Sequence, residues 1–304
     1  MIAYLARRVL QAVGVVLLVT LIVFGLIRLA PGGAAVGVLG SGSAHQQFLV
    51  QYLTWLGRVL SGNLGRSLRL NESVGALLAA SLPRTLVLAG LSTLIALLIA
   101  VPIGLLQAVR RNSVVDHVLR GLTYLLYGAP PFVLGLLLIL YLAVDAHIFG
   151  AEGPQAPGIG GFISDARDLT LPVATLTLVT IAIFARYMRS SALDSLGQEY
   201  VQAARARGGG QGRVVVSHVL RNSLVPIVTL LGLSLPQIVG GALVVEILFN
   251  IQGMGWQIWQ AAVNHDFPVT LGFTLVIGAA AALGSLLADI GYAVLDPRVR
   301  ASRP

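Results

Sequence analysis

The sequence predicts an all-α integral membrane protein, in which residues 1–304 form a single domain of six transmembrane helices. Two observations predict this fold class. Only 11% of the residues are charged and the mean hydropathy is +0.86, whereas a soluble domain carries about 25% charged residues. The chain also contains apolar stretches close to the roughly 20 residues that a spanning helix needs, and these run over about 9–29, 86–109, 118–144, 171–188, 224–249 and 269–295.

The first of these stretches could also belong to a secretory signal peptide. Its apolar run continues from Val9 to Ile27, which is longer than the roughly 7–15 apolar residues of a signal peptide. The residues that follow offer no convincing cleavage site. We therefore expect a retained first span.

Arginine placement predicts the orientation of the spans, because cytoplasmic connections carry an excess of basic residues. With the N-terminus inside, most arginines fall on the cytoplasmic side, namely Arg7, Arg8, Arg110, Arg111, Arg120, Arg186, Arg189, Arg205, Arg207, Arg213, Arg221, Arg298, Arg300 and Arg303. We therefore expect both termini and the loop at 189–223 in the cytoplasm, and the long loop at 30–85 outside. The net charge of +8 reflects this topology, and no nucleic-acid partner is expected.

Missing residue types exclude several classes of function. All 20 basic residues are arginine, and the chain has no cysteine. A nucleotide-binding P-loop needs a lysine, so the glycine-rich stretch at 208–213 is not one, and any ATPase that drives this protein must be another chain. The sequence has no HExxH or GxSxG motif. We expect no catalytic residue, no metal site and no cofactor in this chain.

The segment at 199–226 lies between the predicted fourth and fifth spans. Residues 202–206 are good or nearly neutral helix formers, and the glycines at 208–210 end a helix because each costs about 1 kcal/mol in a helical position. A second helical run at 213–222 leads into the fifth span. The periodicity alone is typical of a solvated surface helix with its arginines near anionic headgroups. A helix with an alanine face that contacts a partner protein is the alternative.

The same segment resembles the cytoplasmic "EAA" loop of ABC importer permeases, in which Glu-Ala-Ala is followed after three residues by Gly. The match here is Gln202-Ala203-Ala204-x-x-x-Gly208, with glutamine where the general pattern has glutamate. The runs EYVQAARARG and HVLRNSLVPIVTLLG are similar to the peptide/nickel branch of these permeases. That branch shares the displacement of the loop's proline, which here is Pro226.

The resemblance to this branch extends over almost the entire chain. Its first span, outer loop, third span, fifth span and C-terminus are similar to YLARRVLQAVGVVLLVTLIVFGLIRLAPG, QYLTWLGRVLSGNLGRSL, GAPPFVLGLLLIL, GGALVVEILFNIQGMG and DIGYAVLDPRVR. One departure is the stretch from Ala34 to Gln47, which is shorter and richer in small residues than the branch's outer segment. Contact with an extracytoplasmic receptor is therefore the least supported of the properties that the resemblance implies.

The resemblance implies a type I ABC importer permease fold in the bacterial cytoplasmic membrane. In that family, the first helix of the cytoplasmic loop is a coupling helix, which inserts into a cleft on a separate ATPase subunit. Carried over to this sequence, the coupling residues are Glu199, Ala203, Ala204, Arg205 and Gly208.

The resemblance also implies the partners and the substrate class. The partners are a second homologous permease subunit, two ABC ATPase subunits or domains that hold ATP and Mg, an extracytoplasmic substrate-binding protein, and membrane lipid. The implied substrates are short peptides, with nickel chelates, glutathione and other small solutes left open. The chain itself is then a transport subunit and not an enzyme.

Helix breakers and one acid within the predicted spans are candidates for the translocation pathway. Prolines free backbone carbonyls and kink helices, which a membrane tolerates where water or protein satisfies the freed groups. The candidate pathway residues are Gly128, Pro130, Pro131, Gln237, Gly240, Gly241 and Glu246, with Pro236 as a further break. The alternatives are helix packing through small residues for the breaks and interfacial exposure for Glu246.

A self-sufficient secondary transporter or channel is the alternative function. Such a protein would need inverted repeats or half-helices facing a midplane site, and the sequence has no convincing internal repeat. It also lacks a buried series of acids and histidines that could relay protons.

Overall fold

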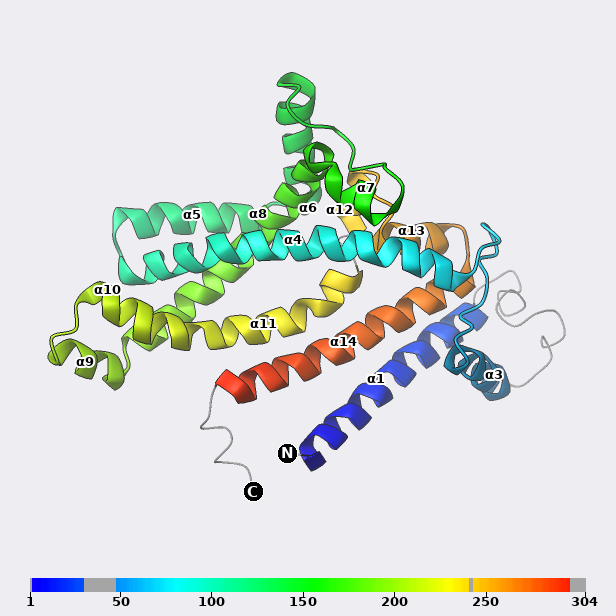
Figure 1. The fold of residues 1–304 in the computed structure, drawn as a ribbon, viewed down its shortest axis with the longest axis horizontal. Helices are drawn as coiled ribbons and strands as arrows, with labels where there is room; N and C mark the ends of the chain where they lie inside the picture. The colour runs from blue at the N-terminus through cyan, green and yellow to red at the C-terminus, as the bar shows by residue number, and fades with distance from the viewer. Residues whose placement is uncertain (1, 30–47, 241–242, 296–304) are drawn as a thin grey trace. The chain divides into compact units, whose positions relative to one another are not determined.

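The structure is a computed structural model that describes residues 2–29, 48–240 and 243–295. These residues are mostly helical, and they include no named strand, only an isolated bridge between Arg66 and Ser73. The predicted all-α fold class is confirmed. The helices in chain order (Figure 1) are α1 (Ile2–Leu29), α3 (Phe48–Leu60), α4 (Val74–Val109), α5 (Val114–Gly128), α6 (Pro131–Leu138), the π-helix η2 (Ile139–Asp145), α7 (Gly158–Ser164), α8 (Ala166–Leu196), α9 (Glu199–Ala206), α10 (Gln211–Val214), the π-helix η3 (Val215–Leu220), α11 (Arg221–Gly240), α12 (Leu243–Leu248), α13 (Met254–Val263) and α14 (Phe267–Leu295).

Several described helices are long and apolar enough to cross a membrane. Four qualify by themselves, at Val74–Val109, Ala166–Leu196, Gln211–Leu235 and Phe267–Ala288. A fifth qualifies if α5 forms one broken span with the following stretch Pro131–Asp145, which comprises α6 and η2. The two halves are bent by 102° at the break. The described part of α1 holds a shorter apolar helix, Val13–Leu26. The chain is thus a multi-pass membrane protein, and the number of six spans stays a prediction.

Helix α4 begins well before the predicted second span, which we expected at residue 86. Its first turns hold polar side chains such as Ser81 and Arg84, so a search for continuous apolar residues does not detect them. The predicted outer loop at 30–85 therefore contains α3 and the beginning of α4. The stretch from Ala34 to Gln47, which we singled out above, lies outside the described residues.

The chain forms two compact units that interleave in sequence. Unit 1 comprises Met1–Val87, Glu152–Ala166 and Leu235–Leu286, and unit 2 comprises Leu88–Ala151, Arg167–Ser234 and Leu287–Pro304. Helices α4, α8, α11 and α14 therefore contribute residues to both units, α8 by its first residue alone.

Buried side chains in unit 1 connect helices that are distant in sequence. Phe24 of α1, Tyr52 and Trp55 of α3, and Leu271 of α14 form one cluster. A second cluster joins the start of α4 to α13 and α14 through Val74, Leu77, Leu78, Met254, Ala261, Val269 and Phe273. Burial of such apolar groups stabilises each contact by roughly 25 cal/mol per Å² removed from solvent. Between helices that face lipid, the hydrophobic driving force is absent, and close packing holds the helices together instead.

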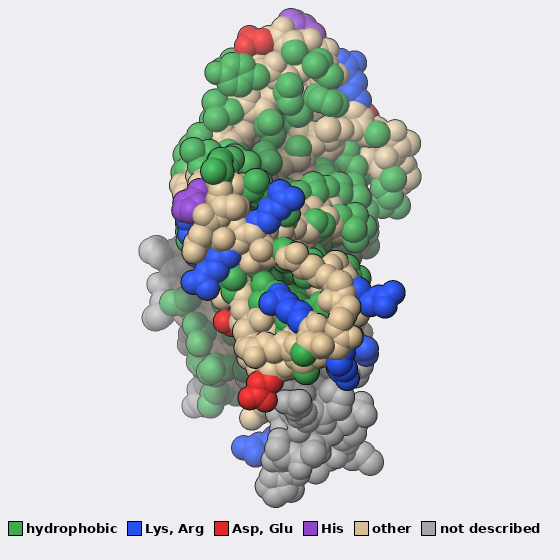
Figure 2. Space-filling model, turned by 90° about the vertical axis from the view of Figure 1, so that its left-hand side faces the viewer, with side chains coloured by type: hydrophobic (Ala, Val, Ile, Leu, Met, Phe, Trp, Pro, Cys, Tyr) green, Lys and Arg blue, Asp and Glu red, His purple; other side chains and the backbone are tan. Residues whose placement is uncertain are grey.

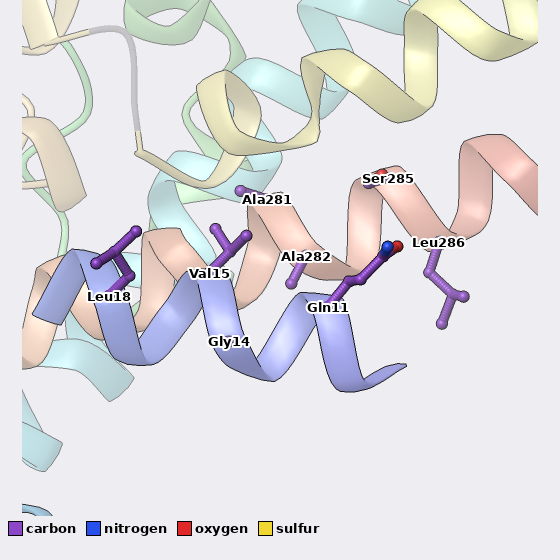
Figure 3. A pocket seen from close by; sticks show the side chains of 8 residues that line it. All are labelled: Gln11, Gly14, Val15, Leu18, Ala281, Ala282, Ser285 and Leu286. Carbon is purple, nitrogen blue, oxygen red and sulfur yellow. The ribbon is translucent and has the colours of Figure 1, made fainter. Parts of the chain in front are cut away.

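Helices α1 and α14 border a groove in unit 1 (Figure 3). The groove has a volume of about 580 Å³, and its walls are formed by Gln11, Gly14, Val15, Leu18, Ala281, Ala282, Ser285 and Leu286. Gln11 and Ser285 are its polar side chains, and the rest of the lining is apolar or small. Such a lining is typical of a surface within a membrane.

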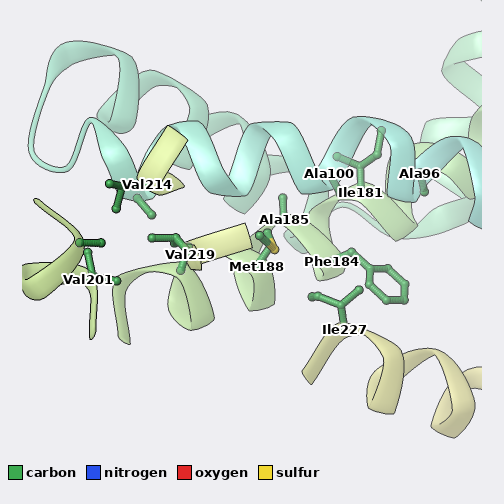
Figure 4. Close-up of a cluster of buried hydrophobic side chains, with 13 residues drawn as sticks. Ala96, Ala100, Ile181, Phe184, Ala185, Met188, Val201, Val214, Val219 and Ile227 are labelled. Atoms are coloured by element: carbon green, nitrogen blue, oxygen red, sulfur yellow. The ribbon is translucent and has the colours of Figure 1, made fainter. Parts of the chain in front are cut away.

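A buried cluster in unit 2 joins helices from three parts of the sequence (Figure 4). It takes Ala96, Ala100 and Ala108 from α4, Ile181, Phe184, Ala185, Met188 and Ala192 from α8, and Val201, Ala204, Val214, Val219 and Ile227 from the stretch that runs from α9 through α11. Gly104 allows α4 to approach α8 closely, because any larger residue would place its Cβ only 2.6 Å from the carbonyl oxygen of Ala185. The cluster is what fixes the position of α9 within unit 2.

Candidate functional site

Helix α9 is the element that the sequence assigns to coupling. It runs from Glu199 to Ala206, as its helix-forming composition predicts. Glu199 lies in its first turn and Arg205 in its last, the two ends at which an acid and a base stabilise a helix through its dipole. The helix itself is confirmed, and its contact with an ATPase stays a prediction.

The two faces of α9 differ in burial. Val201 and Ala204 are buried in the cluster of unit 2, whereas Glu199, Ala203 and Arg205 are exposed. The predicted coupling residues therefore divide into two groups. Ala204 holds the helix against its own subunit, while the others are available to a partner.

Helix α9 ends at the three glycines in the way that the sequence predicts. Gly208 has a φ of +82°, a left-handed conformation that glycine adopts at no steric cost and β-branched residues avoid. Its N–H donates to the carbonyl of Arg205 at 2.9 Å, and the N–H of Gly209 donates to the carbonyl of Ala204 at 3.1 Å. These bonds satisfy carbonyls that the end of a helix leaves free.

Arginine side chains gather at the end of unit 2 that carries α9 and α10. Figure 2 looks onto this end and shows several basic groups around the α9 segment. The exposed arginines of the segment and of the turn between α4 and α5 are Arg110, Arg111, Arg205, Arg207 and Arg213. An end of this charge is suited to a cytoplasmic position.

An ion pair that we did not predict joins α5 to α8 near this end. Arg189 donates from Nε to Oδ1 of Asp116 at 3.0 Å and from Nη2 to Oδ2 at 2.9 Å. Asp116 is 0% exposed, and its Oδ2 also accepts from the N–H of Asn112 at 3.0 Å. Helix α8 leads directly into α9, so this pair fixes the helix that positions the coupling segment. The sequence signal was the single acid within an otherwise basic connection.

Gly128, Pro130 and Pro131 interrupt the predicted third span, as expected. Helix α5 ends at Gly128 and α6 begins at Pro131, with a bend of 102° between the two halves. Proline at the first position of α6 is compatible with a helix start, since that position needs no N–H. The break is confirmed, and a role in the pathway is still to be tested.

The other predicted breaks lie at the end of α11. Pro236, Gln237 and Gly240 belong to its last residues, and α11 ends at Gly240. Gly241 lies outside the described residues, and so do the side-chain surroundings of Gln237. The fifth predicted span, at 224–249, is therefore described as α11 followed by the separate helix α12.

Glu246 lies at a junction of three helices in unit 1. Its Oε1 accepts from the hydroxyl of Thr85 on α4 at 2.6 Å, and its Oε2 accepts from the N–H of Trp256 on α13 at 3.0 Å. Thr85 in turn accepts from the N–H of Met254 at 2.7 Å. A carboxylate at this position satisfies free N–H groups in the first turn of α13. The alternative of an interfacial, exposed Glu246 is wrong, because the side chain is 0% exposed.

Replacing Glu246 with alanine is expected to lower the free energy of unfolding of the subunit by about 1–3 kcal/mol, because Thr85 and Trp256 lose a buried partner. Denaturant titration of the detergent-solubilised subunit measures this. Glu72→Ala is the matched control, since the Glu72 side chain is exposed in the same unit. Equal stability of the two variants would show that Glu246 does not hold the junction.

The histidines do not form a metal site within the described residues. No group of three or more His, Cys, Asp or Glu side chains in that part of the chain could hold a metal ion. His218 lies in η3, in the connection between α9 and α11.

Comparison with known proteins establishes the family. A family model described as "Binding-protein-dependent transport system inner membrane component" matches residues 100–301. The chain belongs to this family. It is 38% identical to a putative peptide permease protein of Brucella suis biovar 1, with 99% of each chain covered.

Two further permeases are similar over nearly the whole chain. The chain is 35% identical to the oligopeptide transport system permease protein AppB of Bacillus subtilis, over 98% of this chain and 99% of that one. It is 29% identical to the dipeptide transport system permease protein DppB of Escherichia coli, over 99% of each chain. Family membership thus confirms the resemblance seen in the sequence, and α9 lies within the matched region.

Proposed function

We propose that this chain is a transmembrane permease subunit of an ATP-driven ABC importer of short peptides, in which separate ATPase subunits drive alternating access. The observation that carries the proposal is similarity over 98–99% of the chain to relatives named as peptide, oligopeptide and dipeptide permeases. ATP and Mg bind to the partner subunits, since the chain has no lysine for a P-loop.

The proposed topology has six spans with both termini and α9 in the bacterial cytoplasm. The exposed arginines around α9 and the turn between α4 and α5 support this orientation. Helix α9 is the proposed coupling helix. Its support is an exposed face with Glu199, Ala203 and Arg205, together with anchoring of the opposite face by Val201 and Ala204.

The proposed pathway follows the breaks in the third and fifth spans. Gly128, Pro130 and Pro131 lie at the 102° bend between α5 and α6, which supports a position where water or protein meets freed carbonyls. Gln237, Gly240 and Gly241 complete the proposed set, and the buried Glu246 supports it by holding α12 against α4 and α13. A second permease subunit forms the other wall, and an extracytoplasmic binding protein delivers the peptide.

Reconstitution tests the proposed function against a self-sufficient channel or carrier. Proteoliposomes with this chain, its partner permease, the ATPases and the binding protein are expected to accumulate a radiolabelled dipeptide only with ATP. Vesicles with this chain alone are expected to show no flux above protein-free vesicles. The control is a complex whose ATPases carry a substitution of the P-loop lysine. Flux through the chain alone would favour the channel or carrier.

A further inference from the structure

Arg186 of α8 stacks on two tyrosines of α5. Its guanidinium carbon lies 4.2 Å from the centre of the Tyr127 ring and 5.4 Å from that of the Tyr124 ring. Both pairs are within the range of a cation–π interaction. Tyr127 and Tyr124 are 57% and 54% exposed, and Arg186 is exposed as well. Among the described residues, no carboxylate forms an ion pair with Arg186.

The guanidinium of Arg186 is turned away from the charged end of unit 2. Arg189, one turn further along α8, pairs with Asp116 at the start of α5. Tyr124 and Tyr127 follow Asp116 by 8 and 11 residues, which is roughly 12 and 16 Å along the helix. Arginines close to a membrane surface ordinarily extend toward the headgroups. Arg186 instead lies over Tyr124 and Tyr127, which belong to the predicted third span at 118–144, and Arg186 itself belongs to the predicted fourth span at 171–188.

A guanidinium within a membrane span cannot stably face lipid tails. Charged groups inside a membrane face a water-filled cavity or another protein, because exposure to hydrocarbon is costly. The exposed face formed by Arg186, Tyr124 and Tyr127 therefore borders the pathway or a partner subunit and not the lipid.

The break after α5 adds hydrogen-bond acceptors beside this face. Pro130 and Pro131 have no N–H, so they cannot satisfy the carbonyls of Leu126 and Tyr127 four residues earlier. Cation, aromatic rings and free carbonyls thus lie together within one turn of helix. This combination matches a short peptide, which has a carboxylate for Arg186 and N–H groups for the carbonyls.

We propose that Arg186, Tyr124 and Tyr127 bind the terminal carboxylate of the transported peptide within the membrane. The proposal rests on the proposed function of the chain and assigns the peptide a contact site in the pathway. A lipid phosphate has similar chemistry, but the position of Tyr127, nine residues inside the predicted third span, favours a solute in the pathway.

Single-cysteine labelling tests the site, because the chain contains no cysteine of its own. Tyr127→Cys, in the complete complex, is expected to react with water-soluble methanethiosulfonate reagents, since a thiol reacts as the thiolate in water. The anionic reagent is expected to react about five to ten times faster than the cationic one, because Arg186 attracts it. Adding Arg186→Gln should remove this preference, and adding Arg110→Gln, at an exposed arginine of the same unit, should not.

Leu125→Cys is the matched position control. Leu125 is 67% exposed, but it lies on another face of α5, which the proposal leaves to lipid. A cysteine there is therefore expected to remain unreactive toward water-soluble reagents. Tyr124→Cys repeats the test if the first variant fails to assemble. A free dipeptide is expected to slow labelling at least fivefold, and the same dipeptide with a C-terminal amide should not.

Three results would overturn the proposal in a complex that still transports. They are an unreactive cysteine at position 127, an equal rate for both reagents, and equal protection by the acid and the amide. A charge preference that is present in phosphate-free detergent and lost in vesicles of either neutral phosphatidylcholine or anionic phosphatidylglycerol would assign the site to lipid phosphate. Because ATP-dependent uptake is measured separately, any of these results leaves the proposed transport function standing.

Discussion

Gly208→Val is expected to abolish ATP-driven uptake by the assembled complex while the subunit still inserts into the membrane. The φ of +82° at Gly208 is a conformation that costs a β-branched residue about 1–3 kcal/mol. Valine would pull the chain out of this conformation and break the hydrogen bonds that end α9. The exposed face of α9 would then no longer meet its partner in the correct orientation. Uptake of a labelled dipeptide and substrate-stimulated ATP hydrolysis measure the effect.

Two variants at the same turn make this test specific. Gly210→Val is the control, because Gly210 has a φ of −60° and a ψ of 146°, which valine adopts readily. It is expected to transport like the unmodified chain. Gly208→Asn should retain an intermediate activity, since asparagine tolerates the left-handed region better than valine does. Normal coupling in Gly208→Val would refute the assignment of α9 as the coupling helix.

Asp116→Ala is expected to destabilise the subunit and reduce transport, because it leaves the guanidinium of Arg189 without its partner. The loss in unfolding free energy should lie between the about 0.2–1 kcal/mol of an exposed pair and the about 3–5 kcal/mol of a fully buried one. The intermediate value follows because Asp116 is buried and the Arg189 side chain is 20% exposed. Denaturant titration in detergent, followed by uptake assays, measures both effects.

A double-mutant cycle separates the ion pair from other effects of the substitution. The double variant Asp116→Ala/Arg189→Ala should be less destabilised than the sum of the two single variants. Asp194→Ala is the control on the same helix, since Asp194 is exposed and should change stability by less than about 0.5 kcal/mol. Strict additivity would show that the pair does not hold α8.

Local features of the fold could be predicted from the sequence because their causes are local. Helix α9 follows from its alanines, its end follows from Gly208, and the break before α6 follows from two prolines. Each depends on the conformational preferences of residues that are adjacent in the chain. Helix α4 begins before the predicted second span, because hydropathy measures lipid affinity and not helix formation.

Contacts between distant residues could not be predicted in the same way. Glu246 and Thr85 are separated by 161 residues, and Arg189 and Asp116 by 73. No periodicity within one helix shows which partner its charged residue will meet. Burial of Ala204 also depends on helices from other parts of unit 2, so the sequence alone could not separate it from the exposed members of the coupling set.

The packing of α9 determines how a displacement of this helix would spread within unit 2. Val201 and Ala204 pack in the same cluster as Ala100 of α4, Met188 of α8 and Ile227 of α11. Close-packed interiors have little free volume and low compressibility. A displacement of α9 would therefore be transmitted to α4, α8 and α11 with little deformation of the cluster between them.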